Sequence, residues 1–472
     1  MFHAKNLIHG TLIESGNPAP VINPATEAPC GTQEKASIAL ADEALLAAKN
    51  AFPVYSHLSI NERASLIMTL REKIISRKEG IIDLLVAETG KTNENAGYDF
   101  SMLVDCLAFF IEEVKRHYAK SIPDYDNKFF NQLVYEPTGV VAAFLAWNFP
   151  LLNLGYKLGP ILASGCTCVI KPSAETPLAT ALVGELIAET AFPAGTVNIV
   201  LGESTDIGYA LAHSNIPRLL TMIGSTYGGM KLIENSTSSV KRFSLELGGN
   251  APVIVFDDAD VNTAVEAIVD LKFSNAGQIC VAPNRVFVHE KVYASFLSKA
   301  KRLAEAYTPG SGACKAPAIQ PVISKRAFDR ILASIDTSMK DGANLICGGT
   351  RMKKPGYFIA PTILETPSAS MDICANEIFG PVMPIVRFTD TDDIFAVANE
   401  CDAGLASYLF TDSNARIMDA TERLLYGNIC VNGVHYSIQL PHGGLKQSGY
   451  GKDIGHLCLD DYFDVKRVSV RR

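Results

Sequence analysis

Three segments of the chain hold side chains that could carry out covalent chemistry on a small molecule. Cys280 follows a loop of small and amide residues, FSNAGQIC, and a thiolate is the best soft nucleophile among side chains. Glu246 stands between leucines in SLELGG, where a buried carboxylate can act as a general base. Asn148 in AWNFP has an amide N–H₂ that can stabilise an oxyanion. Taken singly, each also has an ordinary structural explanation: a buried cysteine, a carboxylate bonded to nearby backbone, and a turn asparagine before proline.

Three further segments have residue types suited to a phosphate-bearing ligand. Lys171 ends an apolar run in VIKPSAETP and suits a ribose hydroxyl or a phosphate. Gly224 and Ser225 lie where a predicted strand gives way to a helix, and backbone N–H groups at a helix N-terminus attract phosphate. Glu377 and Phe379 precede a Gly-Pro turn in NEIFGPV. The ordinary alternatives are a surface lysine, a helix cap, a surface glutamate and a core phenylalanine, and the chain has neither a GxGxxG nor a Walker A sequence.

The elements that must position these side chains alternate along the chain. Helical periodicity fills residues 41–120, after a start of turns and short strands. From about 138 to 256 short apolar runs alternate with helical stretches, and a second alternating region runs from 257 to about 435. In this second region we expect helices that include residues 324–341 and 390–400, and a strand at residues 357–364. Such alternation indicates a parallel sheet covered on both faces, with ligands beyond the carboxyl ends of its strands. We therefore predict an α/β fold with two doubly wound parallel sheets.

Composition and charge exclude several classes of partner. The 472 residues include 42 basic and 50 acidic side chains, and the resulting charge of −8 argues against nucleic acid as the main partner. Asn, Lys and Pro interrupt the longest apolar stretch, Val140 to Ile170, so we predict no membrane contact. Eleven cysteines without C-x-x-C, and dispersed histidines without H-E-x-x-H, indicate a reducing compartment and no metal site. The N-terminus lacks an apolar leader, and the predicted location is cytoplasmic.

Taken in order, these segments resemble the aldehyde dehydrogenase superfamily over essentially the whole chain. The matching motifs are AWNFP, the Lys-Pro strand end, Gly-Ser-Thr, ELGG, GQIC, EIFGPV and GGLKQSG, and ELGG followed by GQIC about 34 residues later is highly specific. The resemblance implies NAD(P)-dependent oxidation of an aldehyde to a carboxylic acid. It implies that Cys280 attacks the carbonyl and that Asn148 and the Cys280 backbone N–H hold the oxyanion. Glu246 would activate the water that hydrolyses the resulting thioester.

The same resemblance implies a binding site for NAD or NADP. Its residues would be Trp147, Lys171, Ser173, Gly224, Ser225, Leu247, Glu377 and Phe379. Lys171 would hold the adenosine ribose and Glu377 the nicotinamide ribose, while the pyrophosphate would lie against Gly224 and Ser225. Ala174 stands where NAD-preferring relatives often have a glutamate. Because the missing carboxylate removes repulsion against a 2′-phosphate, NADP stays open beside NAD.

The resemblance also implies three parts and a homo-oligomer. The parts would be an NAD(P)-binding domain of residues 1–119 and 139–246, a catalytic domain of residues 247–435, and a small β oligomerisation flap of residues 120–138 and 453–472. Family members are usually dimers or tetramers, so we expect a homodimer or a homotetramer. The β-prone ending YFDVKRVSVRR would pair either with a partner subunit or within its own chain.

The substrate prediction depends on departures from two similar branches, the succinate-semialdehyde and amino-aldehyde dehydrogenases. Ser274 and Tyr156 stand where succinate-semialdehyde enzymes typically have arginines, and a bidentate carboxylate clamp is not easily replaced. Amino-aldehyde relatives place acids on the helix that holds Asp99, but Met102 occupies the position of a second acid. The expected pocket mixes aromatic with neutral polar side chains: Met102, Phe149, Asn153, Tyr156, Tyr436 and His442. We predict a small neutral, hydroxylated or aromatic aldehyde, with a semialdehyde or an amino-aldehyde as the alternative.

Two functions of other classes would use the same framework. A cysteine acyltransferase or a CoA-acylating dehydrogenase would also need Cys280, but CoA-acylating relatives usually lack the base at Glu246. A non-catalytic structural member of the family would be expected to lose Cys280, Glu246 or Asn148, and all three are present.

Overall fold

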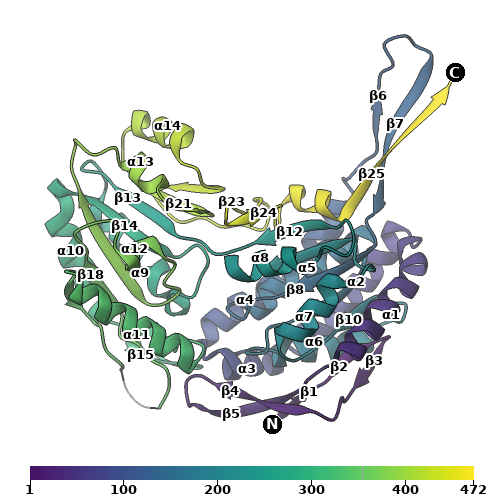
Figure 1. The fold of residues 1–472 in the computed structure, drawn as a ribbon, viewed down its shortest axis with the longest axis horizontal. Coiled ribbons are helices and arrows are strands. Elements are labelled where there is room, and N and C mark those ends of the chain that lie inside the picture. The colour runs from purple at the N-terminus through teal and green to yellow at the C-terminus, as the bar shows by residue number, and fades with distance from the viewer. Residues whose placement is uncertain (353–354) are drawn as a thin grey trace.

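The structure is a computed structural model that describes residues 1–352 and 355–472. Figure 1 shows two large α/β units facing each other across the molecule, with a narrow three-stranded sheet projecting from one corner. The α/β fold with two doubly wound sheets is the predicted one. Within the described residues, we find no helix whose length and hydropathy would let it span a bilayer.

The first large sheet has a parallel centre and antiparallel edges. Its eight strands stand in the order β24-β12-β11-β8-β9-β10-β2-β3. Their bounds are β2 (Asn6–Ile8), β3 (Thr11–Ile13), β8 (Val140–Phe144), β9 (Thr167–Lys171), β10 (Val197–Ile199), β11 (Leu219–Ile223), β12 (Arg242–Glu246) and β24 (Gly449–Tyr450). The chain runs from β8 to β9 and β10 on one side, then returns to β11 and β12 on the other. The carboxyl ends of β8 and β11 therefore flank a topological switch point, where such sheets bind ligands.

Helices cover both faces of this sheet, because each central strand is apolar on both sides. The four helices ahead of the parallel strands are α1 (Ile38–Ser56), α2 (Ile60–Ser76), α3 (Lys78–Thr89) and α4 (Asn93–Val114). Those that connect the parallel strands are α5 (Pro150–Ser164), α6 (Leu178–Ala188), α7 (Ser204–His213) and α8 (Thr226–Glu234). Val141 and Ala143 of β8 join the core beneath α2–α6, whereas Val140, Ala142 and Phe144 join the core beneath α1 and α7. This alternation is the two-residue period of a strand.

A close helix contact holds the element that will carry the site. Helix α5 packs tightly on α4 because α5 has glycine at two contact positions. A Cβ at Gly155 would lie 2.9 Å from the Leu103 Cα, and one at Gly159 would lie 3.2 Å from the Cys106 carbonyl oxygen. Only glycine allows the backbones to approach so closely, and α4 therefore fixes the position of α5.

The second large sheet is parallel except at one edge. Its seven strands stand in the order β17-β18-β19-β14-β13-β21-β22, with β17 antiparallel. The strand bounds are β13 (Ala251–Val255), β14 (Pro283–His289), β17 (Asn344–Cys347), β18 (Thr362–Glu365), β19 (Val382–Phe388), β21 (Ala406–Phe410) and β22 (Asn428–Val431). The helices of this unit are α9 (Val261–Phe273), α10 (Glu290–Glu305), α11 (Lys325–Lys340), α12 (Asp372–Ala375), α13 (Ile394–Asn399) and α14 (Asn414–Arg423).

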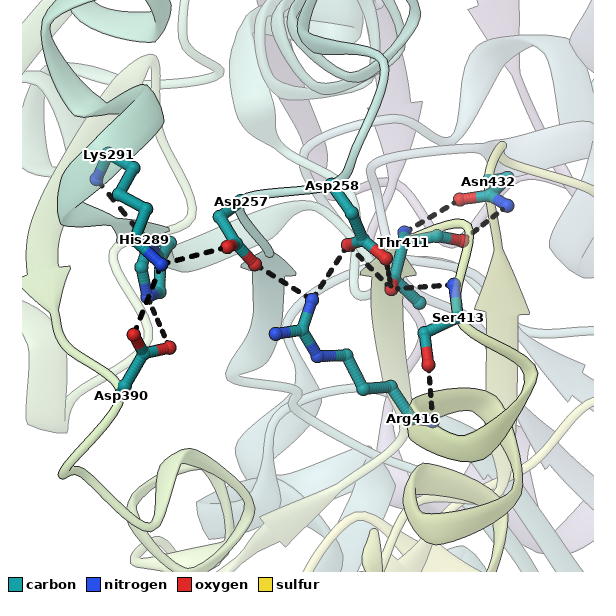
Figure 2. A network of polar contacts seen from close by, with 9 residues as sticks. All are labelled: Asp257, Asp258, His289, Lys291, Asp390, Thr411, Ser413, Arg416 and Asn432. Carbon is teal, nitrogen blue, oxygen red and sulfur yellow. Dashed lines mark hydrogen bonds and ion pairs between the residues drawn. The ribbon is translucent and has the colours of Figure 1, made fainter.

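Charged side chains neutralise one another at the carboxyl edge of this second sheet (Figure 2). Asp257 and Asp258 follow β13, and Arg416 of α14 donates to both carboxylates at 2.8 Å. Lys291, after β14, bridges Asp257 and Asp390 at 3.1 and 3.2 Å. This edge, where a doubly wound sheet could bind a ligand, is thus tied together by the protein's own ion pairs.

The projecting sheet is made of β6 (Lys120–Ile122), β7 (Phe129–Pro137) and the C-terminal β25 (Phe463–Arg471). Strand β25 runs antiparallel to β7 along its whole length, from the pair Phe463–Pro137 to the pair Arg471–Phe129. Of the two interpretations of the C-terminal segment, pairing within its own chain is therefore present. The remaining elements are β1 (Phe2–Ala4), β4 (Pro18–Asn23), β5 (Ala28–Glu34), β15 (Thr308–Pro309), β16 (Ala318–Ile319), β20 (Ala403–Gly404) and β23 (Leu445–Lys446), with short 3₁₀ turns at Ser274–Gly277 and His456–Tyr462.

Candidate active site

A cavity of about 750 Å³ lies between the two α/β units, at the carboxyl edge of the first sheet. Most of the predicted site residues line it: Trp147, Asn148, Phe149, Asn153, Tyr156, Ser173, Gly224, Ser225, Glu246, Cys280, Glu377, Phe379, Tyr436 and His442. The fold thus brings together side chains from both halves of the chain. The predicted Lys171 and Leu247 are buried and are not among the described residues that line the cavity, and Met102, which we also expected at the pocket, packs against the core of the first unit.

Cys280 is presented by a strained turn. The residues ahead of it, Asn275 and Ala276, both adopt left-handed backbone conformations, with φ of 48° and 54°. Gly277 follows at φ 71°, and a Cβ there would lie only 2.2 Å from the Gly380 carbonyl oxygen. The turn places Cys280 ahead of β14, at the amino end of the second sheet, and not at a carboxyl end as strand alternation suggested. Strain of this kind persists only where the surrounding structure holds it.

Glu246 reaches the same point from the other unit. It is the last residue of β12, and the two glycines that follow carry the chain across to β13. A Cβ at Gly249 would lie 2.1 Å from the Cys280 carbonyl oxygen, so no other residue fits there. The Gly249 N–H donates to the Glu377 carboxylate at 3.0 Å. The ELGG sequence therefore brings the carboxylate and the cysteine loop into contact.

The surroundings of the Cys280 thiol disfavour its ionised form. Burial raises the pKa of Cys280 well above its usual value, and the nearby Glu246 carboxylate raises it further. The Cys280 Sγ, the Glu246 carboxylate oxygen and a His442 ring nitrogen all lie within 4.8 Å of one another. A thiol in this setting needs a proton acceptor before it can attack, and Glu246 is within reach.

Hydrogen bonds fix the amide of Asn148 beside the cysteine loop. Its Nδ2 donates to the Gln278 carbonyl at 3.2 Å, and its Oδ1 accepts from Asn153 Nδ2 at 3.4 Å. Asn275 Nδ2 in turn donates to the Asn148 backbone carbonyl at 3.1 Å. An amide N–H₂ has two donors, and these bonds use one of them. The second N–H is thus available to a carbonyl oxygen on Cys280.

A buried ion pair anchors the start of α5, directly after Asn148. Asp99 accepts from the Leu152 N–H at 2.7 Å and pairs with Lys91 at 2.5 Å, and both charged side chains are fully buried. The Lys91 ammonium also lies 3.8 Å from the centre of the Phe149 ring. Because Asp99 is already paired with Lys91, it offers no free carboxylate to a cationic substrate.

The far side of the cavity, lined by Ser225, Glu377 and Trp147, suits a dinucleotide. Ser225 caps α8, so the helix N-terminus opens onto the cavity, where it can attract a diphosphate. Lys171 is buried with its Nζ bonded to the Pro172 carbonyl at 2.7 Å, and burial lowers its pKa to about 8. Burial raises the pKa of Glu377 to about 7. Trp147 and Phe379 meet edge to face at 5.3 Å, and Leu247 packs against Gly229 behind them. These residues fit a diphosphate, two riboses and a flat ring.

Two arginines that line the cavity were not among the predicted site residues. Arg326 and Arg330 of α11 line it, and the Arg330 guanidinium donates to the Ile378 carbonyl at 2.7 Å, beside Glu377. Their spacing of four residues on a predicted helix places both on one face, which was the available signal. Their charge complements the diphosphate expected there.

Hydroxyl and imidazole groups line the part of the cavity around Tyr436 and His442. The Tyr436 hydroxyl bonds to that of Tyr408 at 2.7 Å, and Tyr408 donates to the Val281 carbonyl at 2.8 Å. The ring of His442 meets Tyr436 edge to face, and its Nε2 lies 3.6 Å from Glu246 Oε1. Asn95 and Tyr98 of α4 also line the cavity and had not been predicted.

Comparison with known proteins agrees with this geometry. A family model described as the aldehyde dehydrogenase family matches residues 13–468. The chain belongs to the aldehyde dehydrogenase family. It is an NAD(P)-dependent oxidoreductase that acts on aldehydes.

Individual aldehyde dehydrogenases match over nearly their full length. A mitochondrial succinate-semialdehyde dehydrogenase of Oryza sativa subsp. japonica is 36% identical, covering 100% of this chain and 90% of the relative. A 3-sulfolactaldehyde dehydrogenase of Pseudomonas putida is 36% identical, covering 97% of this chain and 94% of the relative. A crystal structure of an NADP-dependent enzyme of E. coli superposes with a TM-score of 0.97 at 34% identity, covering 100% of this chain and 98% of the other.

Proposed function

We propose that this aldehyde dehydrogenase works through a covalent intermediate on Cys280. Glu246, within 4.8 Å of the thiol, accepts its proton as the sulfur attacks the aldehyde carbon. The free N–H of Asn148 and the Cys280 backbone N–H stabilise the oxyanion of the thiohemiacetal. Loss of hydride leaves a thioester. Glu246 releases the thiol proton to solvent and then takes a proton from the water that attacks the thioester; the C–S bond breaks, which frees the carboxylic acid and returns Cys280. The observation that carries this proposal is the meeting of Cys280, Glu246 and Asn148 in one cavity.

NAD or NADP supplies the hydride acceptor when bound. We propose that the residues of the far side hold it: the α8 N-terminus at Ser225 with Arg326 at the diphosphate, Glu377 and Lys171 at the two riboses, and Trp147 at the ring. The Phe379 ring, edge to face with Trp147, would pack beside that ring.

For the substrate, we propose a short aldehyde that carries an acidic group at its far end. The supporting observation is the similarity to the succinate-semialdehyde and 3-sulfolactaldehyde dehydrogenases. Succinate semialdehyde has a carboxylate at its far end, and 3-sulfolactaldehyde has a sulfonate there. In this chain, neutral donors would hold that group, because Ser274 and Tyr156 occupy positions where succinate-semialdehyde enzymes typically have arginines. Asn95 and Tyr98 offer further N–H and O–H donors to the cavity.

A neutral hydroxylated aldehyde is the second candidate. Among the described residues that line the cavity, the only Lys or Arg side chains are Arg326 and Arg330, which lie toward Glu377 on the cofactor side. The substrate side, with Tyr156, Tyr436 and His442, thus offers hydrogen bonds without a lysine or arginine to balance an anion. A hydroxyl group is better matched to such a lining than an ion is.

Kinetics with matched substrates distinguish the two candidates. We would compare kcat/KM for succinate semialdehyde and for 4-hydroxybutanal, which has the same chain length without the charge, each with NAD and with NADP. The acid-bearing substrate is favoured if its kcat/KM is at least about tenfold higher, which corresponds to about 1.4 kcal/mol of transition-state binding. The reverse ratio selects the hydroxylated aldehyde. No oxidation of either substrate, by folded protein, contradicts both.

We also propose that the projecting sheet is an oligomer contact. Strand β25 stands at its edge, and valines exposed along this strand include Val465 and Val470, each more than half exposed. An edge strand with exposed valines is suited to pairing with a second copy of the chain. Light scattering after size exclusion should give a dimer or a tetramer, and removal of residues 463–472 should yield monomer.

A further inference from the structure

Three potential metal ligands from distant parts of the chain meet in the active site. Glu246 ends β12, Cys280 precedes β14, and His442 lies in the segment between β22 and β23. One ligand atom from each, the carboxylate oxygen, Sγ and a ring nitrogen, falls within 4.8 Å of the other two. The His442 Nε2 and Glu246 Oε1 are 3.6 Å apart, too far for a hydrogen bond.

One oxygen of the Glu246 carboxylate lacks a hydrogen-bond partner. Glu246 Oε1 is a buried atom without a partner among the described residues, and it faces His442 Nε2. The side chains are only 5% and 9% exposed. Buried polar atoms are nearly always satisfied, so an unsatisfied carboxylate oxygen facing an imidazole points to a missing ligand.

The backbone around His442 is held firmly. Its N–H donates to the Asp453 carbonyl at 2.8 Å, and the Asp453 N–H returns a bond to the His442 carbonyl at 2.6 Å. The Asp453 carboxylate is in turn paired with Lys157 of α5 at 2.5 Å. These bonds hold the backbone that carries the imidazole, and the ring itself packs edge to face on Tyr436.

We propose that Glu246, Cys280 and His442 form a binding site for Zn²⁺ that blocks the active site reversibly. Thiolate, imidazole and carboxylate are the three ligand types that zinc takes, at about 2.3, 2.0 and 2.1 Å. In a tetrahedron with those lengths, nitrogen and oxygen ligands stand roughly 3.4 Å apart, close to the observed 3.6 Å. Three protein ligands leave the fourth position to water. Hard Mg²⁺ and Ca²⁺ prefer all-oxygen sites and are not expected to bind.

Zinc at this position would remove both reacting groups. The bond from Zn²⁺ to Sγ displaces the thiol proton, which passes to solvent, and no electron is transferred. The bond to Glu246 occupies the proposed base. The inhibition that follows rests on the proposed function, whereas zinc binding itself does not.

Thiol protection measures the binding without turnover. The full-length protein is treated with iodoacetamide with and without Zn²⁺, and alkylation of each cysteine peptide is followed by mass spectrometry. We expect Zn²⁺ to slow alkylation of Cys280 at least tenfold, EDTA to restore it, and Mg²⁺ to leave it unchanged. The exposed Cys314 is the internal control, and its rate should not change.

Two substitutions test the histidine. In His442→Phe and in His442→Asn, protection of Cys280 should need at least about tenfold more zinc, the smaller of the losses known for weakened metal sites. An unchanged Cys314 rate and thermal midpoint show that each variant is folded, and either variant suffices. Absence of protection in the unmodified protein, or equal protection in the variants, would overturn the proposal. Protection without any aldehyde oxidation would keep the zinc site and reject the proposed function.

Discussion

Replacement of Glu246 by glutamine should make the Cys280 thiol more acidic. Glu246→Gln removes the negative charge and keeps the size of the side chain. The carboxylate oxygen lies no more than 4.8 Å from Sγ, so its repulsion of a thiolate is at least about 0.9 kcal/mol in a water-like medium. At an effective dielectric constant of 20 it is about 3.5 kcal/mol. Since 1.36 kcal/mol is a factor of ten, the thiolate population at pH 7 should rise roughly fourfold to several hundredfold.

The assay is the pH dependence of Cys280 alkylation in cofactor-free protein. The midpoint of the profile should move to lower pH in Glu246→Gln. The rate at pH 7 should increase by a smaller factor, about twofold to twentyfold, because a more acidic thiol is also a weaker nucleophile. Glu377→Gln is the matched control, since this carboxylate also raises the pKa of Cys280 but contributes less than Glu246. A profile that stays in place in Glu246→Gln would refute the contact between base and thiol.

Four further predictions concern the rest of the site and its supports. Asn148→Ala should lower kcat about 10²- to 10³-fold with little change in KM, as measured by steady-state kinetics, because an oxyanion donor acts mainly in the transition state. Lys171 has a pKa lowered to about 8, so it is charged below that pH and neutral above it; KM for NADP should rise about fivefold between pH 7 and 9.5, while KM for NAD changes less. Lys91→Met should lower the free energy of unfolding, measured with denaturant, by about 3–5 kcal/mol, because it leaves the buried Asp99 carboxylate without its partner. The double variant Lys91→Met with Asp99→Asn should regain most of that free energy. Arg416→Met, at the carboxyl edge of the second sheet, should lower the free energy of unfolding by about 1.5–3 kcal/mol, because Arg416 bonds two carboxylates there. The thermal midpoint should fall and the specific activity should stay unchanged.

The sequence allowed the fold class and much of the site to be predicted because both depend on local patterns. Buried parallel strands such as Val140–Phe144 are uninterrupted apolar runs, and the glycines after Glu246 are required by a contact that only glycine permits. Element ends were less accurate. The strand expected at residues 357–364 is Thr362–Glu365, because its ladder with β19 begins only after Pro361. The helix expected at residues 390–400 begins at Ile394, where Asp393 caps it.

Features that depend on distant contacts could not be predicted in the same way. Asp99 looks like a free pocket acid in the sequence, but Lys91 and the α5 N-terminus neutralise it. The placement of His442 beside Glu246 follows from the bridge to Asp453, which no local pattern encodes. The domain boundaries at 119, 139, 246 and 435 and the cytoplasmic location stay predictions.

Trapping of the covalent intermediate tests the central claim most directly. Glu246→Gln protein is mixed with NAD or NADP and succinate semialdehyde, quenched in acid, and digested for mass spectrometry, with 4-hydroxybutanal in a parallel sample. The thiol of this variant is more acidic and can lose its proton to solvent, so attack and hydride loss still occur while hydrolysis lacks its base. The proposed mechanism therefore predicts one acyl group per chain, on the Cys280 peptide, whose mass identifies the aldehyde that was oxidised. Reduced cofactor formed without any acyl group on Cys280, or an acyl group on another cysteine, would contradict it.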